Sequence, residues 1–358
     1  MRRAAALIVG GGPAGAAAAI RLGQGGARPL LFERNAAPRD VVCGGFLGWD
    51  SLAALHRLGI DPGALGARPI KRLRLVSSRR TVEAALPYRA AGLSRRTLDE
   101  ALLDAAARAG AEIVRGRTVR AADSLRIRLD DGEEIVADAL LLATGKHEMR
   151  GAERDAAIAE APIGLRAALA PGRDLARDLD GWIELHLFDG GYAGLLIQDD
   201  GQVNLCLSAS RARLKAAGGA EPLVRALAAE LPALAARLEA GEVGPWSAVA
   251  GVPYGWRARR TGRDVYRLGD QAAVIASLAG DGIAIALESG RSAAEALLAG
   301  RAAPEWQSDF ARRSRRPIVI AEALRRIAER PVREAALLLL RALPGLAARG
   351  AGLTRIGG

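Results

Sequence analysis

Short apolar runs that stop at glycines, each followed by a segment of helical periodicity, dominate the first 150 residues. Residues 4–9 form such a run, and it ends at Gly10, which predicts a buried parallel strand. Residues 14–22 predict a helix that Pro13 can begin, because the first turn of a helix does not need its N–H. A second strand is predicted at residues 29–32. The order strand, helix, strand indicates a Rossmann-like α/β domain.

Two later helices are predicted by their caps. Ser94 is a candidate N-cap for a helix whose apolar face contains Leu98 and Leu102. Gly280-Asp281-Gly282 precedes a helix of about five turns. Further strands are predicted at residues 112–114, 117–120, 138–142 and 265–268.

The middle of the chain changes character, since its strands follow one another with little helix between them. Strands are predicted at residues 161–169, 182–188, 195–198 and 202–208, with a turn at residues 190–194. Asp199-Asp200-Gly201 is a strong hairpin signal. Residues 211–241 are expected to be helical with a break.

Residues 306–358 form a basic amphipathic helical tail, which Pro331 and Pro344 divide. It could lie on a membrane surface and meet lipid-like substrates. The alternative, which we favour, is that it packs on the cofactor domain.

The composition is that of a globular protein, because half of the 358 residues are apolar. The net charge of +11 comes almost entirely from Arg, since the lysines are only Lys71, Lys146 and Lys215. Aromatic residues are scarce, so no base-stacking platform for nucleic acid is expected. Cys43 and Cys206 stand alone, which argues against disulfide frameworks and metal sites. Without a signal peptide or a membrane-spanning segment, we expect a cytoplasmic monomer, with peripheral contact to the inner face of the membrane as an open alternative.

The first strand–helix junction carries candidate chemistry. Gly10, Gly12 and Gly15 satisfy G-x-G-x-x-G, in which glycines allow a tight turn, the approach of a pyrophosphate and close packing of the helix. Glu33 follows 23 residues after Gly10, where an acidic residue would accept from ribose hydroxyls. The pattern does not separate NAD from FAD, and a strand–turn–helix without a ligand is the alternative. The glycines around Asp281 offer a second helix N-terminus for an anion or a carbonyl oxygen.

Four landmarks in order, GGGPAG with Glu33, SRRTLD, LLLATG, and LGDQAA with AGDGIAIALESG, resemble the FAD-dependent oxidoreductases of the para-hydroxybenzoate hydroxylase fold. That group includes aromatic monooxygenases and geranylgeranyl reductases, and Cys43-Gly44-Gly45 resembles a loop of its reductase-like members. For Cys43 the alternative is a small packed residue. The resemblance covers residues 4–150 and 245–300. It implies that FAD is bound by Gly10, Gly12, Pro13, Ala14, Gly15, Glu33, Arg34, Cys43, Gly44, Gly45, Arg95, Val119, Gly145, Asp270, Gly280, Gly282 and Ile283.

The sequence departs from that family at one position that bears on the reductant. Hydroxylases of this fold usually carry Asp-Gly where this chain has Thr144-Gly145, which argues against direct reduction by NADPH. NADPH and a separate flavin or ferredoxin reductant therefore both stay open as electron sources.

We expect a fold with an FAD-binding domain (residues 1–150 and 251–302), an inserted antiparallel-sheet substrate domain (151–250, with 65–95 on the substrate side) and a helical tail (303–358). Candidates for the wall of the substrate pocket are His186, Tyr192, Tyr254 and Trp256, with packing at a sheet or domain seam as the alternative. No residue is assigned a catalytic role. The expected activity is monooxygenation of a phenolic or lipid-like molecule through a flavin C4a-hydroperoxide. The alternatives are a reductase of isoprenoid-type double bonds and an inactive flavin-fold binding protein.

Overall fold

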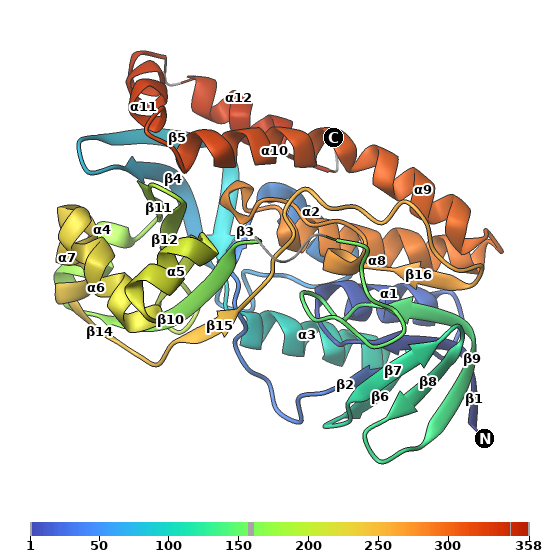
Figure 1. The fold of residues 1–358 in the computed structure, drawn as a ribbon. Helices are drawn as coiled ribbons and strands as arrows, with labels where there is room; N and C mark the ends of the chain where they lie inside the picture. Colours follow the sequence, from blue (N-terminus) through green and yellow to red (C-terminus); the bar gives the residue numbers. More distant parts are fainter. Residues whose placement is uncertain (1, 157–160, 344, 357–358) are drawn as a thin grey trace.

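Two β-sheets and the helices that cover them make up the computed structural model, which describes residues 2–156, 161–343 and 345–356 (Figure 1). The first sheet is at the lower right of Figure 1, the second is at the left, and the C-terminal helices run along the top. The expected α/β class is confirmed.

The first sheet contains seven strands of the described residues: β1 (Arg2–Val9), β2 (Leu30–Glu33), β6 (Glu112–Arg115), β7 (Val119–Asp123), β8 (Arg126–Leu129), β9 (Glu134–Leu142) and β16 (Val265–Arg267). Their order is β6-β2-β1-β9-β8-β7, and β16 pairs with β9. β1, β2, β6, β9 and β16 pair in parallel, whereas β7 and β8 are antiparallel to their neighbours. β1 and β16 both pair in parallel with β9, so their carboxyl ends lie at the same edge of the sheet. The turn after β1 and the turn after β16 therefore lie at that edge.

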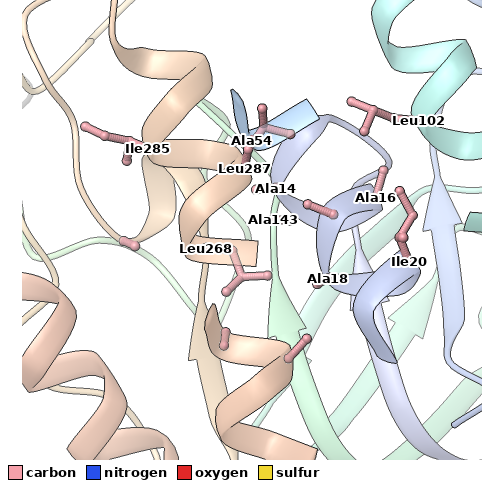
Figure 2. Close-up of a cluster of buried hydrophobic side chains, with 14 of the residues drawn as sticks. Ala14, Ala16, Ala18, Ile20, Ala54, Leu102, Ala143, Leu268, Ile285 and Leu287 are labelled. Atoms are coloured by element: carbon pink, nitrogen blue, oxygen red, sulfur yellow. The ribbon is translucent and has the colours of Figure 1, made fainter. Parts of the chain in front are cut away.

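α1 (Pro13–Gln24) packs on both α3 (Arg95–Arg108) and α8 (Gly282–Leu298), and α1 and α3 contact the first sheet. α1 approaches α8 closely because its packed face is built from alanines, of which Ala14, Ala16 and Ala18 are visible in Figure 2. A Cβ on Gly290 of α8 would lie 2.1 Å from the Ala14 carbonyl oxygen, so glycine is required for this approach. Leu102 of α3 and Leu287 of α8 complete the same core.

The second sheet contains nine strands of the described residues: β3 (Phe46–Leu47), β4 (Arg68–Val76), β5 (Thr81–Gly92), β10 (Ile163–Pro171), β11 (Trp182–Phe188), β12 (Gly191–Ile197), β13 (Val203–Ala209), β14 (Gly241–Val243) and β15 (Ser247–Val249). Their order is β14-β10-β13-β12-β11-β4-β5-β3, with β15 on β10. The sheet is mixed and not purely antiparallel as expected, because β4 and β11 pair in parallel. This pairing joins residues of the 65–95 segment to the middle of the chain.

Two local expectations are wrong. The predicted turn at residues 190–194 is confined to Asp189 and Gly190, since Gly191 already lies in β12, where a Cβ would meet the Ser208 carbonyl oxygen at 2.3 Å. The strand predicted at residues 117–120 begins at Val119, because the carboxylate of Asp130 accepts hydrogen bonds from the Thr118 N–H and the Arg117 side chain and holds both outside the ladder.

The remaining helices are α2 (Trp49–Arg57), α4 (Arg173–Leu179), α5 (Arg211–Ala217), α6 (Ala220–Glu230), α7 (Pro232–Glu239), α9 (Ala303–Arg313), α10 (Arg315–Ala328), α11 (Arg333–Ala342), α12 (Gly345–Leu353) and the 3-10 turns η1 (Gly269–Gln271) and η2 (Ser277–Ala279). In the tail, α9 packs on α8 and β16, whereas α11 and α12 pack on β5 of the second sheet. Pro331 lies between α10 and α11, and Pro344 lies outside the described residues. The tail therefore contacts both sheets.

Candidate functional site

A cavity of about 560 Å³ is bounded by both sheets and by the tail. Its wall includes Gly12, Pro13 and Ala14 from the turn after β1, and Gly280 and Gly282 from the turn before α8. The two turns that the sequence singled out thus face one space, although 265 residues separate Gly15 from Gly280.

The first turn is shaped by glycines that the cavity does not reach. Gly10 has a φ of +108°, and its N–H donates to the Phe32 carbonyl oxygen at 2.8 Å. A Cβ on Gly15 would lie 1.9 Å from the Gly10 carbonyl oxygen, so α1 can begin directly on this turn only with glycine there. As a result, the N-terminus of α1 points its free N–H groups toward the cavity.

Arg95 places a cation beside this turn. Its guanidinium binds both carboxylate oxygens of Asp99, each at 2.7 Å, and it lines the cavity next to Gly12. Burial alone would lower the pKa of Arg95, but Asp99 outweighs that effect and holds the pKa above its usual value. Ser94 caps α3 by accepting from the Thr97 N–H, and so fixes the start of the helix that carries Arg95.

Besides Gly10 and Gly15, three predicted cofactor residues lie outside the cavity wall, namely Glu33, Arg34 and Val119. The Glu33 carboxylate accepts from the Gly11 N–H at 2.8 Å and from the Asn35 N–H at 2.9 Å, which braces the turn from behind. Arg34 is exposed and contacts His147. Val119 is half-buried at the start of β7. Their predicted contacts with the adenosine half of FAD stay predictions.

The loop of Cys43, Gly44 and Gly45 lines the cavity at its centre. It is held by the Asn204 side-chain amide, which donates to the carbonyl oxygens of Cys43 at 3.0 Å and of Gly44 at 2.8 Å. Cys43 is half-buried. It packs against the core of the first sheet and also forms part of the cavity wall.

Gly145, Asp270 and Ile283 also line the cavity, as predicted cofactor residues. Beside them lies Lys146, which sequence reasoning did not select, with its Nζ 3.3 Å from Asp270 Oδ2. The Asp270 carboxylate is the largest cause that raises the pKa of Lys146. Its position in the sequence could have indicated a role in the site, because Lys146 directly follows the Ala-Thr-Gly at the end of β9 and is one of only three lysines.

Beyond the Cys43 loop the wall becomes apolar. It is formed by alternate residues of the second sheet and by side chains of α10 and α11, including Leu73, Leu75, Ile183, Leu185, Leu187, Leu196, Leu324, Ile327, Leu337 and Leu340. In the described residues, a cluster of hydroxyls interrupts this wall near η2.

Tyr192 and Tyr254, two of the four predicted pocket residues, contribute to that cluster. Both phenol oxygens contact Ser277 Oγ, at 2.5 Å for Tyr254. Ser208 Oγ lies 3.4 Å from the Tyr254 oxygen. Burial is the main cause that raises the pKa of both tyrosines, so their hydroxyls keep their protons.

The other two predicted pocket residues do not line the cavity. His186 lies on the opposite face of β11 from Leu185 and Leu187, because side chains alternate along a strand, and its Nε2 is 2.8 Å from Glu184 Oε1. The Trp256 Nε1–H donates to the Asp155 carbonyl oxygen at 2.8 Å, away from the wall. Neither residue is therefore part of the pocket wall.

His186 belongs to a buried charge cluster with Glu184, Arg74 and Arg237. Arg74 donates to Glu184 at 2.7 Å, and Arg237 donates to both Glu184 oxygens at 2.9 and 3.0 Å. Burial alone would raise the pKa of Glu184, but the hydrogen bonds from His186, Arg237 and Arg74 outweigh it and hold the pKa well below its usual range. The cluster joins α7 to the outer face of the second sheet.

The cavity offers open backbone and positive charge to a cofactor. A Cβ on Gly44, Gly145 or Gly282 would meet nothing within 4 Å, so the backbone is open to the cavity at all three positions. Arg95 and Lys146 place two cations next to the bare amides of the first turn, which suits a pyrophosphate. The residues present therefore fit FAD.

Comparison with known proteins agrees with this geometry. Residues 5–154 match the family model of the pyridine nucleotide-disulphide oxidoreductases. Menaquinone reductase of Mycobacterium tuberculosis is 29% identical over 341 residues, which cover 89% of this chain and 82% of that protein. Digeranylgeranylglycerophospholipid reductase 2 of Methanopyrus kandleri is 29% identical and covers 81% of this chain and 75% of that protein. The solved structure of the flavin-dependent brominase Bmp2 superposes with a TM-score of 0.80 at 17% identity, covering 98% of this chain and 93% of that one. The resemblance seen in the sequence is thus confirmed: residues 5–154 match a family model of flavin- and pyridine-nucleotide-dependent oxidoreductases, and the chain shares the fold of a flavin-dependent enzyme along most of its length.

Proposed function

We propose that this enzyme reduces a carbon–carbon double bond in a lipid-like, isoprenoid-type substrate. The observation that carries the proposal is the apolar half of the cavity, which extends from the Cys43 loop to α10 and α11. An unbranched polar substrate would leave these leucines facing water, whereas an isoprenoid chain would bury them. The same cavity reaches both glycine turns, so such a chain would end beside the cofactor.

Bound FAD would supply the two electrons that this reduction requires. The chain's own residues supply position and exclusion of water. The leucine wall keeps the reacting end dry, which strengthens every polar contact made there. The hydroxyls of Tyr192, Tyr254 and Ser277 can hydrogen-bond a substrate oxygen or hold a proton next to the reduced bond.

Two observations favour reduction over the hydroxylation that the sequence first suggested. The relatives that align along most of the chain are named reductases, of menaquinone in one case and of an isoprenoid-chain lipid in the other. Thr144 also replaces the acidic residue that hydroxylases of this fold usually carry. For the same reason we expect electrons from a separate flavin or ferredoxin reductant in preference to NADPH.

We also infer contact with the membrane surface. Eight large apolar residues of the tail are exposed: Val319, Leu324, Ile327, Val332, Leu338, Leu339, Leu343 and Leu353. Leu324, Ile327 and Leu339 line the cavity as well, so the exposed apolar surface continues into it. Among the helices of the described residues, none has the length and apolar content of a bilayer span. Flotation with anionic vesicles tests this contact, and a Leu338→Glu/Leu343→Glu variant should float less than the parent protein.

The decisive experiment uses purified, flavin-loaded protein that has been photoreduced without oxygen. Menaquinone and geranylgeranyl diphosphate are added separately, and the products are analysed by mass spectrometry. Gain of two hydrogen atoms under anaerobic conditions would support the reductase. Incorporation of an oxygen atom from labelled dioxygen, only in air, would identify a monooxygenase instead. Failure to bind flavin would identify the inactive binding protein.

A matched pair of variants connects that activity to the cavity. Leu185→Trp places a large ring in the apolar wall, whereas Leu298→Trp changes an exposed residue that is not part of it. We expect Leu185→Trp to lose turnover and keep its flavin. Equal turnover in the two variants would show that the substrate lies elsewhere.

A further inference from the structure

The segment after α12 returns to the cofactor end of the cavity and buries a cation there. The side chain of Arg355 is only 6% exposed and forms an ion pair with Asp281, the residue between Gly280 and Gly282. Its guanidinium carbon lies 4.0 Å from the centroid of the Trp49 ring, and its Nη1 lies 3.5 Å from Asp50 Oδ1. Arg355 also lines the cavity, so this cation faces the space that the cofactor would occupy.

Asp281 has no other partner of comparable strength in the described part of the chain. It is 0% exposed, and both of its carboxylate oxygens are buried without a hydrogen bond. A buried carboxylate without a cation is costly, and it usually binds a proton instead. The pairing with Arg355 therefore offsets part of the cost of burying the Asp281 carboxylate at this position.

The place of Asp281 gives this pair a consequence for the cofactor. Gly280 and Gly282 flank it. The family resemblance, which implies that Gly280, Gly282 and Ile283 bind FAD, also implies that the amides of residues 280–283 face the pyrimidine edge of the flavin. Reduction puts negative charge on that edge. A carboxylate there opposes reduction, and a guanidinium that neutralises it removes the opposition.

We propose that Arg355 is a positioning residue that neutralises Asp281 and thereby raises the reduction potential of the bound flavin. The proposal rests on the proposed FAD function. The tail would then contribute to the cavity in two ways. Its apolar residues form part of the wall, and Arg355 influences the reduction potential of the flavin.

The first test measures the midpoint potential of the flavin by dye-coupled titration at pH 7.5. Arg355→Leu should lower the potential, and Arg355→Lys should keep it near the parent value because the charge is retained. Asp281→Asn should raise it, since a buried negative charge is removed while Arg355 stays, with Asp50 as its remaining partner. Arg341→Leu, which removes an exposed Arg of the same tail, should leave it unchanged. The proposal is overturned if Arg355→Leu and Asp281→Asn both have the parent potential.

If Arg355→Leu does not fold, the comparison of Asp281→Asn with the double variant Asp281→Asn/Arg355→Leu replaces it. The double variant lacks both charges of the Arg355–Asp281 pair and keeps Asp50, and its potential should lie below that of Asp281→Asn because the cation is gone. Equal potentials in this pair would overturn the proposal just as well.

The second test needs no cofactor and so separates this proposal from the FAD function. Thermal unfolding of the apoprotein is followed in the two single variants and the double variant. Each single variant should unfold at a lower temperature than the parent, and the double variant should recover part of the loss, because neither member of the Arg355–Asp281 pair is then left without the other. Asp50 loses its contact with Arg355 equally in Arg355→Leu and in the double variant, so it does not affect that comparison. Strictly additive shifts would mean that the two residues do not interact, and would overturn the proposal even in a protein that binds FAD normally.

Discussion

Replacing Leu337 by Ala should release α11 from the second sheet. Leu337 is 1% exposed and is the buried residue of this ten-residue helix, where it packs with Val82, Leu185 and Leu187. Leu-to-Ala changes in cores cost about 2–5 kcal/mol. We expect the lower part, about 2–3 kcal/mol, because the lost side chain adjoins an existing cavity and leaves no new enclosed void.

The lost stability of Leu337→Ala can be measured as local opening of α11. A loss of about 2–3 kcal/mol raises the population of detached α11 about 30- to 150-fold. Hydrogen exchange of the peptide covering α11 should speed up by that factor. Leu338→Ala is the matched control, because Leu338 is 49% exposed and exposed substitutions stay within about 0.5 kcal/mol. Equal exchange rates in the two variants would refute the packing argument.

Three further predictions concern the first turn, the charge cluster and the cofactor. Gly15→Val should destabilise the protein by at least about 1–3 kcal/mol in urea and reduce the 450 nm absorbance of bound flavin. Gly345→Ala, at a position where a Cβ meets nothing within 4 Å, should keep its flavin. Glu184→Gln should cost about 3 kcal/mol at pH 7. The folded-state pKa of Glu184 lies below its ordinary 4.5, so the stability that the ionised carboxylate contributes is lost as the pH falls below 4.5. The melting temperatures of the parent and of Glu184→Gln should therefore converge in acid, and a difference that stays constant with pH would contradict this prediction. Arg95→Leu should weaken FAD binding about 10- to 100-fold by titration, and Arg96→Leu, an exposed neighbour, should not; equal affinities would exclude Arg95 from the site.

Local signals predicted the first sheet well. The apolar run before Gly10 gave β1, and the glycines and Pro13 gave the turn and the start of α1. The Asp199-Asp200-Gly201 hairpin joins β12 to β13 as expected. In these cases the residues that decide the structure lie within a few positions of one another, so a pattern along the chain contains the answer.

Long-range features escaped the sequence. The parallel pairing of β4 with β11 joins segments about 110 residues apart, and no local signal marks it. His186 was misplaced because alternation along β11 separates two faces without saying which one meets the cavity. The burial of Arg355 depends on Trp49, Asp50 and Asp281, which only the folded chain brings together.

The pairing of β16 with β9 has a consequence for attempts to divide the protein. Residues 140–142 at the carboxyl end of β9 pair with residues 265–267, which lie beyond the whole inserted sheet. A fragment that stops near residue 150 would expose these leucines with an unsatisfied ladder, and such an edge recruits other chains. We therefore expect the isolated N-terminal fragment to precipitate, and an expression strategy should keep the late strand by covalent linkage or supply it in trans.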